Sequence, residues 1–139
     1  MKSDSKVDLK TGLKYDLHIH TKYSMCGNLE PSLVLKLAKK RGLNGIAITD
    51  HNEMKGCFKT KKLNKDKDFE VVVGSEVRTD KGDLLAYYIN EPIKSRELFD
   101  VLDEIKGQGG LAVVAHPLRH LPATKEKNSC FAKQDNPLR

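Results

Sequence analysis

Short apolar runs alternate with amphipathic stretches over most of this chain, which is typical of β/α units around a mostly parallel sheet. The runs are rich in Val, Ile and Leu and have the length of strands rather than helices. The predicted strands cover residues 15–20, 45–49, 70–74, 84–89 and 111–115. From Leu118 to Arg139 no periodicity of either kind is visible, so we expect an irregular tail there. The pattern therefore predicts an α/β fold.

Three stretches are predicted to be helical, namely residues 31–41, residues 53–63 and the stretch between Ser95 and Gly107. Pro31 suits the first turn of the first helix, and Gly42 follows its expected end. Ser95 is a suitable N-cap for the last helix. Residues 79–83 predict a turn that makes the third and fourth strands an antiparallel hairpin.

The first predicted strand carries His18 and His20, two positions apart. Because side chains alternate between the faces of a strand, both imidazoles point to the same side, which Asp16 shares. Leu17 and Ile19 face the other way. Taken alone, the pair is equally compatible with an exposed edge strand, because His-x-His is a short and common motif.

Three other predicted strands are followed by metal-binding side chains. Asp50 and His51 follow the second strand, Glu76 lies just after the third, and His116 follows the fifth. Individually, these residues also suit a helix cap, an ion pair with Arg78, or a turn. Together they predict one site, because the carboxyl ends of parallel strands meet at one edge of a sheet.

Imidazole and carboxylate ligands together suit Zn, Mn or Fe, and a carboxylate can bridge two ions. Two ions serve phosphate ester hydrolysis well, because they activate a water molecule and stabilise the departing oxygen. The sequence contains no nucleophile elbow, no phosphate-binding P-loop and no dinucleotide fingerprint. We therefore expect hydrolysis by a metal-activated water without a side-chain nucleophile.

Four motifs, in this order, resemble those of the PHP (polymerase and histidinol phosphatase) family. They are Asp16-Leu-His-Ile-His-Thr-Lys-Tyr-Ser24, Ile48-Thr-Asp-His51, Gly74-Ser-Glu76 and Ala115-His-Pro117. The resemblance covers roughly residues 14–118. It implies a distorted, TIM-like (β/α)7 barrel, of which about five of seven strands are present. It also implies a phosphoesterase with two or three divalent metal ions at the carboxyl ends of its strands.

The resemblance also assigns roles by position. The implied metal ligands are His18, His20, His51, Glu76 and His116. Glu76 corresponds to the bridging carboxylate, and Glu76, His51 and Asp50 are the residues expected to serve catalysis, with Asp50 orienting its neighbour. Further ligands or positioning groups are expected at Asp16, Asp50 and Asp83. Asp83 stands where many members have a histidine, and Cys26 stands where some have an aspartate.

The family also places an Asp-x-His motif late in its barrel, and this sequence contains none. With 139 residues the chain is shorter than the roughly 200 that a closed α/β barrel usually needs. We expect a polar leader over residues 1–13, the PHP domain over 14–118, and an irregular or non-native tail over 119–139. A truncated or frameshifted chain, or a barrel completed by a partner, would explain the shortfall. A degenerate module without activity is therefore an alternative to the enzyme.

The net charge of +6 adds a second alternative, a basic nucleic-acid-binding protein. The positive charge is most concentrated in a cluster of five lysines, Lys59, Lys61, Lys62, Lys65 and Lys67. For an enzyme, the expected substrate is a phosphorylated small molecule, a nucleotide or a nucleic-acid end. The sequence shows no apolar span and no signal peptide, and its three cysteines lack a disulfide pattern. We therefore expect a cytoplasmic protein that does not bind membranes.

Overall fold

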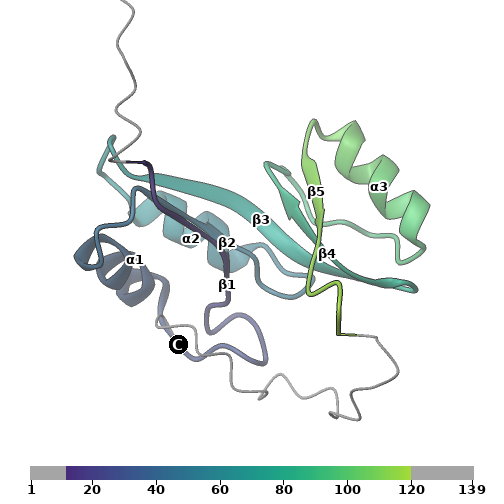
Figure 1. The fold of residues 1–139 in the computed structure, drawn as a ribbon, viewed down its shortest axis with the longest axis horizontal. Coiled ribbons are helices and arrows are strands. Elements are labelled where there is room, and N and C mark those ends of the chain that lie inside the picture. Colours follow the sequence, from purple (N-terminus) through teal and green to yellow (C-terminus); the bar gives the residue numbers. More distant parts are fainter. Residues whose placement is uncertain (1–11, 120–139) are drawn as a thin grey trace, which may run out of the picture.

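The computed structural model describes residues 12–119, which form eight elements (Figure 1). In chain order these are β1 (Tyr15–Ile19), α1 (Pro31–Lys40), β2 (Gly45–Ile48), α2 (Lys55–Leu63), β3 (Glu70–Thr79), β4 (Gly82–Tyr87), α3 (Leu98–Gly107) and β5 (Leu111–Val114). Each predicted strand and helix is present. Of the expected tail, residues 120–139 lie outside the described residues.

The strands form one mixed five-stranded sheet in the order β1-β2-β3-β4-β5. Neighbours among β1, β2 and β3 are parallel, whereas β4 is antiparallel to both β3 and β5. β5 therefore runs in the same direction as the first three strands. The sheet curls into a half-barrel, as the predicted incomplete barrel requires (Figure 1). Because four strands share one direction, their carboxyl ends lie at the same edge.

β3 is longer than predicted, because it continues to Thr79 instead of ending at residue 74. Its first part pairs with β2, and its second part, from Gly74 onwards, pairs with β4. The hairpin thus supplies hydrogen-bond partners for the backbone beyond the end of β2. Gly74 stands at the change of partner, where a Cβ would come within 2.6 Å of the Ala86 carbonyl oxygen. As a result, Glu76 lies within β3 rather than after it.

The predicted end of α1 is confirmed, because Gly42 adopts a left-handed conformation (φ +72°) directly after the C-cap. The predicted start of α3 is wrong. Ser95 is not the N-cap, because the helix begins three residues later, at Leu98. The backbone N–H of Ser95 instead donates to the Glu104 carboxylate. Glu97 caps the helix instead, and its carboxylate accepts from the N–H groups of Phe99 and Asp100.

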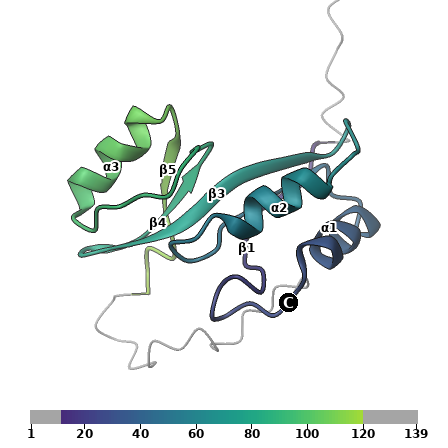
Figure 2. The same ribbon diagram turned by 180° about the vertical axis from the view of Figure 1, so that it is seen from behind.

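Apolar side chains pack on both faces of the sheet. The larger cluster includes Val34 and Ala38 of α1 and Val101 and Ile105 of α3, packed against the strands. Figure 2 shows α1 and α2 on the face that is turned away in Figure 1. The smaller cluster lies on the other face and consists of Ala47, Val72, Leu85, Tyr87 and Ala115. Within the described part of the chain, no helix is long and apolar enough to cross a membrane.

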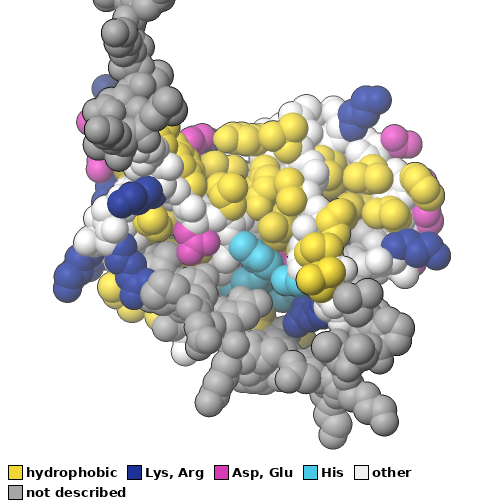
Figure 3. All heavy atoms as spheres, viewed as in Figure 1, with side chains coloured by type: hydrophobic (Ala, Val, Ile, Leu, Met, Phe, Trp, Pro, Cys, Tyr) yellow, Lys and Arg dark blue, Asp and Glu magenta, His cyan; other side chains and the backbone are white. Residues whose placement is uncertain are grey.

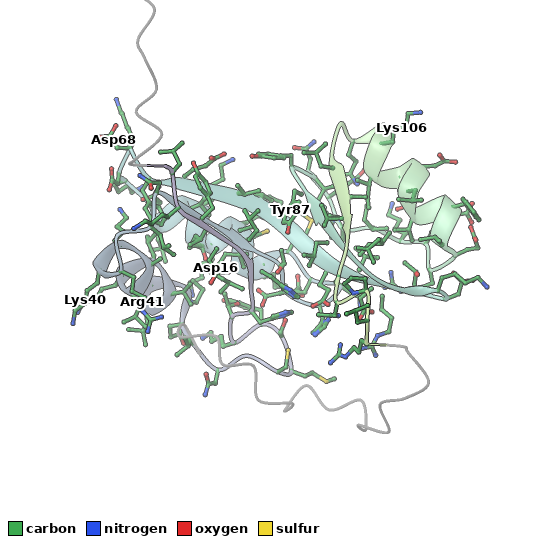
Figure 4. All side chains as sticks on the ribbon, viewed as in Figure 1. Asp16, Lys40, Arg41, Asp68, Tyr87 and Lys106 are labelled. Carbon is green, nitrogen blue, oxygen red and sulfur yellow. The ribbon has the colours of Figure 1, made fainter. Side chains whose placement is uncertain are left out.

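Tyr87 connects the two halves of the sheet on the face with the smaller cluster. Its ring extends from β4 (Figure 4), and its hydroxyl donates a 2.8 Å hydrogen bond to the Leu17 carbonyl of β1. Burial is the main reason that the pKa of Tyr87 is raised, so the hydroxyl keeps its proton and stays a donor. This bond joins residues that are 70 positions apart in the chain.

We predict that Tyr87→Phe lowers the free energy of unfolding by about 1 kcal/mol, because the partly buried hydrogen bond is lost. Urea denaturation measures this change. Tyr88→Phe is the matched control, because its hydroxyl donates to Glu70 on the exposed surface. The control should cost less than about 0.5 kcal/mol. Equal losses in the two variants would contradict the role given to Tyr87.

Candidate metal centre

Four imidazoles surround the carboxylate of Glu76. Its Oε2 atom lies 3.1 Å from His18 Nε2, 3.0 Å from His20 Nε2 and 3.4 Å from His51 Nδ1. Its Oε1 atom lies 3.1 Å from His116 Nε2. The structure therefore brings together all five residues that the sequence predicts as metal ligands.

The backbone explains why these side chains meet. His18 lies on β1 and His20 directly follows it, while His51 forms an isolated parallel bridge with Glu76 beyond the end of β2. His116 follows β5 and has a φ of +37°, a left-handed conformation that histidine adopts more readily than most residues. Such strain is typical of functional positions. On the face seen in Figure 3 the imidazoles gather in one place, bordered by hydrophobic side chains.

The surroundings of this cluster favour an ionised Glu76 carboxylate and disfavour the charged forms of His51 and His116. Burial alone would raise the pKa of Glu76, but the contact with His18, the largest opposing effect, holds it well below its usual value. Burial is also the main reason that the pKa values of His51 and His116 are lowered, although Glu76 opposes the shift. Neutral imidazole and ionised carboxylate are the forms that bind metals.

Ser24 fixes the orientation of His20, a role that was not predicted from the sequence. Its Oγ lies 3.1 Å from His20 Nδ1, accepts from the His51 N–H at 2.8 Å and donates to Asp50 at 3.0 Å. A hydroxyl has one proton to donate, and here Asp50 receives it. His20 Nδ1 must then carry the proton of its own bond to Ser24. The lone pair of His20 therefore lies on Nε2, which faces Glu76.

Asp50 is fully buried and holds Ser24 and the neighbouring Thr21 by hydrogen bonds. Besides Ser24, its carboxylate accepts from the backbone N–H of Thr21 at 2.6 Å and from the Thr21 hydroxyl at 2.7 Å. Gly56 of α2 approaches the carboxylate so closely that a Cβ at this position would overlap it. Asp50 thus accepts three hydrogen bonds from residues beside the metal ligands. These contacts suit the orienting role expected for Asp50.

Three adjoining groups of side chains have the spacing of metal ligands. They are His18, His20 and Glu76; Glu76, Asp83 and His116; and His20, Cys26 and His51. In each group, one ligand atom per residue lies within 4.8 Å of the others. Asp16 and Asp50 belong to none of the groups found among residues 12–119. Asp16 instead accepts from the His18 N–H at 3.2 Å.

The donor atoms fit a bound cation. Glu76 Oε1 is buried and has no hydrogen-bond donor, although His116 Nε2 is 3.1 Å away. His20 Nε2 directs its lone pair towards the other carboxylate oxygen and lies 3.0 Å from His18 Nε2. Unshared electron pairs that face one another at these distances repel, and a metal ion between them converts the repulsion into coordination. The residues therefore fit divalent metal ions.

Comparison with known proteins agrees with this chemistry. The family model described as the PHP domain matches residues 16–133. The chain belongs to the PHP domain family. The match begins at Asp16 and continues past residue 118, where the sequence predicted the end of the domain, into residues that the structure does not describe.

A relative and two solved structures illustrate this similarity. The uncharacterized protein MJ1587 of Methanocaldococcus jannaschii is 45% identical over an alignment of 116 residues, and the match covers 76% of this chain and 68% of that protein. A two-domain protein from Bacteroides vulgatus, which contains a predicted PHP-like metal-dependent phosphoesterase, matches 72% of this chain with a TM-score of 0.61 and 24% identity. An amidohydrolase from Chromobacterium violaceum matches 76% of this chain and 68% of its own, with a TM-score of 0.66 and 18% identity. At these identities, the two structures show the fold alone. The match spans 34% of the Bacteroides protein.

The lysine cluster lies on α2 and on the segment that follows it. Among the contacts of the described residues, Lys59 is the member of this cluster that reaches the loop after β1, where its Nζ lies 3.5 Å from the Tyr23 hydroxyl. Nucleic-acid binding by these lysines stays a prediction.

We predict that Ser24→Ala weakens metal binding about 10- to 100-fold, because residues that orient metal ligands have effects of this size. The variant leaves His20 without the bond that fixes its proton on Nδ1. Calorimetric titration of the metal-free protein with Zn²⁺ measures the affinity. Ser32→Ala, on the exposed surface of α1, is the matched control and should bind as the wild type does. An unchanged affinity in Ser24→Ala would contradict the role of this hydroxyl.

Proposed function

We propose that this protein is a metal-dependent phosphoesterase that hydrolyses a phosphomonoester, a nucleotide or the phosphate of a nucleic-acid end. The observation that carries the proposal is the buried Glu76 carboxylate, which four imidazoles contact within 3.4 Å. Membership of the PHP family supports it, as does the similarity of the fold to that of the Bacteroides vulgatus protein, which contains a predicted PHP-like metal-dependent phosphoesterase.

Divalent ions at such a site lower the pKa of the attacking water and stabilise negative charge on the phosphoryl oxygens. The protein's own contribution is to hold the ligands and to exclude water from the carboxylate. The side chains that would hold the ions are those of His18, His20, His51, His116 and Glu76. Asp50 acts through Ser24, which contacts both His20 and the backbone of His51.

We infer two or three ions, because the three ligand groups adjoin one another and share Glu76 and His20. Glu76 Oε2 lies near three imidazoles and Oε1 lies near that of His116, so each oxygen could contact a separate ion. The ligand set suits Zn, Mn or Fe.

The surroundings of Asp83 favour an anionic substrate. Arg78 Nε lies 3.5 Å and Arg119 Nη1 lies 3.7 Å from the Asp83 carboxylate, next to His116. Guanidinium groups recognise phosphate well because they donate two parallel hydrogen bonds. Together with the net charge of +6, these groups favour a nucleotide or a nucleic-acid end over a small amino alcohol phosphate.

Glu76→Gln tests the proposal, because it keeps the shape of the side chain and removes the charge that binds the ions. The wild type, loaded with Mn²⁺ or Zn²⁺, should release phosphate from an aryl phosphate. We expect Glu76→Gln to lower kcat/KM more than about 100-fold, since the loss of orienting residues alone costs up to about 100-fold. Glu91→Gln, an exposed position, is the matched control and should keep wild-type activity.

A folded, metal-loaded wild type that releases no phosphate from an aryl phosphate, a nucleotide or a phosphorylated oligonucleotide end would refute the proposal. Metal analysis of the same sample identifies the alternative. Less than one tightly held ion per chain, combined with no turnover, would indicate a degenerate PHP module without catalytic activity.

A further inference from the structure

A groove lies at the edge of the sheet opposite the metal centre. Its volume is about 970 Å³, and its walls come from α2, from the first residues of β3 and from the residues that follow β4. Its lining includes Tyr15 and Glu70, where β1 and β3 begin, whereas the imidazoles gather near the carboxyl ends of the strands. Glu70 and Glu76 are six positions apart in β3, which corresponds to about 20 Å of extended chain. The groove is therefore separate from the metal centre.

The groove exists because β4 ends before it has covered the whole of β3. The ladder between these two strands stops at Gly74 and Tyr87, so residues 70–73 of β3 pair with β2 alone within the described sheet. Tyr88 still donates its backbone N–H to the Val73 carbonyl at 2.8 Å, but its left-handed φ of +58° ends the strand. Such a backbone is rare for a bulky residue and is typical of functional positions. The space beside the first part of β3 thus stays open next to α2, which lies along this strand (Figure 2).

Aromatic rings line this groove and are open to solvent. Phe58 of α2 is 45% exposed, and Tyr88 is 49% exposed. The hydroxyls of Tyr15 and Tyr88 donate to the two carboxylate oxygens of Glu70, at 2.9 and 3.3 Å. These bonds hold both tyrosine rings beside the groove. Exposed aromatic faces of this kind are suitable platforms on which nucleic-acid bases stack.

Lysines without an acidic partner border the same groove. Lys61 of α2 and Lys67 of the following segment belong to its lining, and the lysine ion pairs found within residues 12–119 involve neither of them. The acidic residues of the lining are Asp68 and Glu70, and the two tyrosine hydroxyls already bind Glu70. The five lysines of the cluster outnumber these two acids. Positive charge therefore predominates on this side of the molecule.

We propose that this groove binds single-stranded nucleic acid, with bases stacked on Phe58 and Tyr88 and phosphates bound by Lys61 and Lys67. Every base offers a flat face to an aromatic ring, and every linkage offers a negative charge to an ammonium group. In a duplex the neighbouring bases cover these faces, so the rings favour single strands. The inference goes beyond the proposed function and does not depend on it, because the groove is separate from the metal centre.

The test is a fluorescence anisotropy titration of the metal-free full-length protein with a labelled single strand of about ten nucleotides. A chelator prevents hydrolysis at the metal centre. DNA and RNA strands are titrated separately, and binding of either one supports the inference. We expect Phe58→Ala and Tyr88→Asn each to weaken binding about 5-fold or more, because a stacked base contributes at least this much. Asparagine tolerates a left-handed backbone, so Tyr88→Asn removes the ring without adding strain.

Matched controls lie on α3, outside the lining of the groove. Phe99 is 68% exposed there, and Phe99→Ala should bind the strand as the wild type does. Lys61→Gln and Lys67→Gln should each reduce the slope of log affinity against log salt by about 0.7, the contribution of one phosphate contact in a single strand. Lys106→Gln removes the same charge from α3 (Figure 4) and should leave the slope unchanged.

The inference would be overturned if the folded, metal-free wild type bound neither strand, or if both ring variants kept wild-type affinity. An equal change of slope in Lys106→Gln, or equally tight binding of a duplex of the same sequence, would also overturn it. So would displacement of the strand by oligoglutamate, because the groove would then recognise charge alone. If circular dichroism shows that a ring variant does not fold, the lysine variants decide.

Phosphate release by the metal-loaded wild type is scored separately. Binding of a single strand in the groove, combined with no release from any of the phosphate esters named above, supports this inference and refutes the proposed function. Release of phosphate by a protein that binds no strand refutes the groove and leaves the proposed function standing.

Discussion

The centre of this protein depends on a negative charge that folding removes from water. The Glu76 side chain is 1% exposed, and a buried carboxylate is costly unless other groups compensate its charge. The compensating groups are imidazoles that arrive from β1, from the segment after β2 and from the segment after β5. Neutral imidazoles cannot balance the charge alone, but a cation held between them and the carboxylate can. The side chains that surround the buried charge of Glu76 are therefore also suitable ligands for a metal ion.

A second constraint keeps these ligands in place. Asp50 is buried behind them, and its three hydrogen bonds tie Thr21 and Ser24 of the first loop to the end of β2. Through Ser24, this single carboxylate determines which nitrogen of His20 bears the proton. The same loop carries Cys26. The path of this loop thus depends on one buried hydrogen-bond network.

Much of the site was predictable because its residues belong to recognisable local patterns. The His-x-His pair alternates with apolar residues, as in a strand, and Asp50-His51 and His116 each follow an apolar run. Because parallel strands have their carboxyl ends at one edge of a sheet, these residues could be predicted to meet there. Ser24 could not be assigned in this way, because its role depends on three partners from different segments. The N-cap of α3 was misplaced for a similar reason. Glu104, one turn from the helix end, binds the backbone of Ser95 and leaves Glu97 as the cap.

The sequence by itself determined the positions of the strands and helices, the chemistry of the ligands and the resemblance to the PHP family, because these features depend on residue type and on short periodic patterns. The tertiary structure decided that β3 continues into a hairpin, which gives β5 the direction that brings His116 to the centre. It also decided that Asp50 lies behind the ligands, and that Cys26 lies beside two imidazoles. These features depend on the register of the sheet, which places His18 beside Glu76 across 58 positions of sequence. No local pattern encodes a contact of that range.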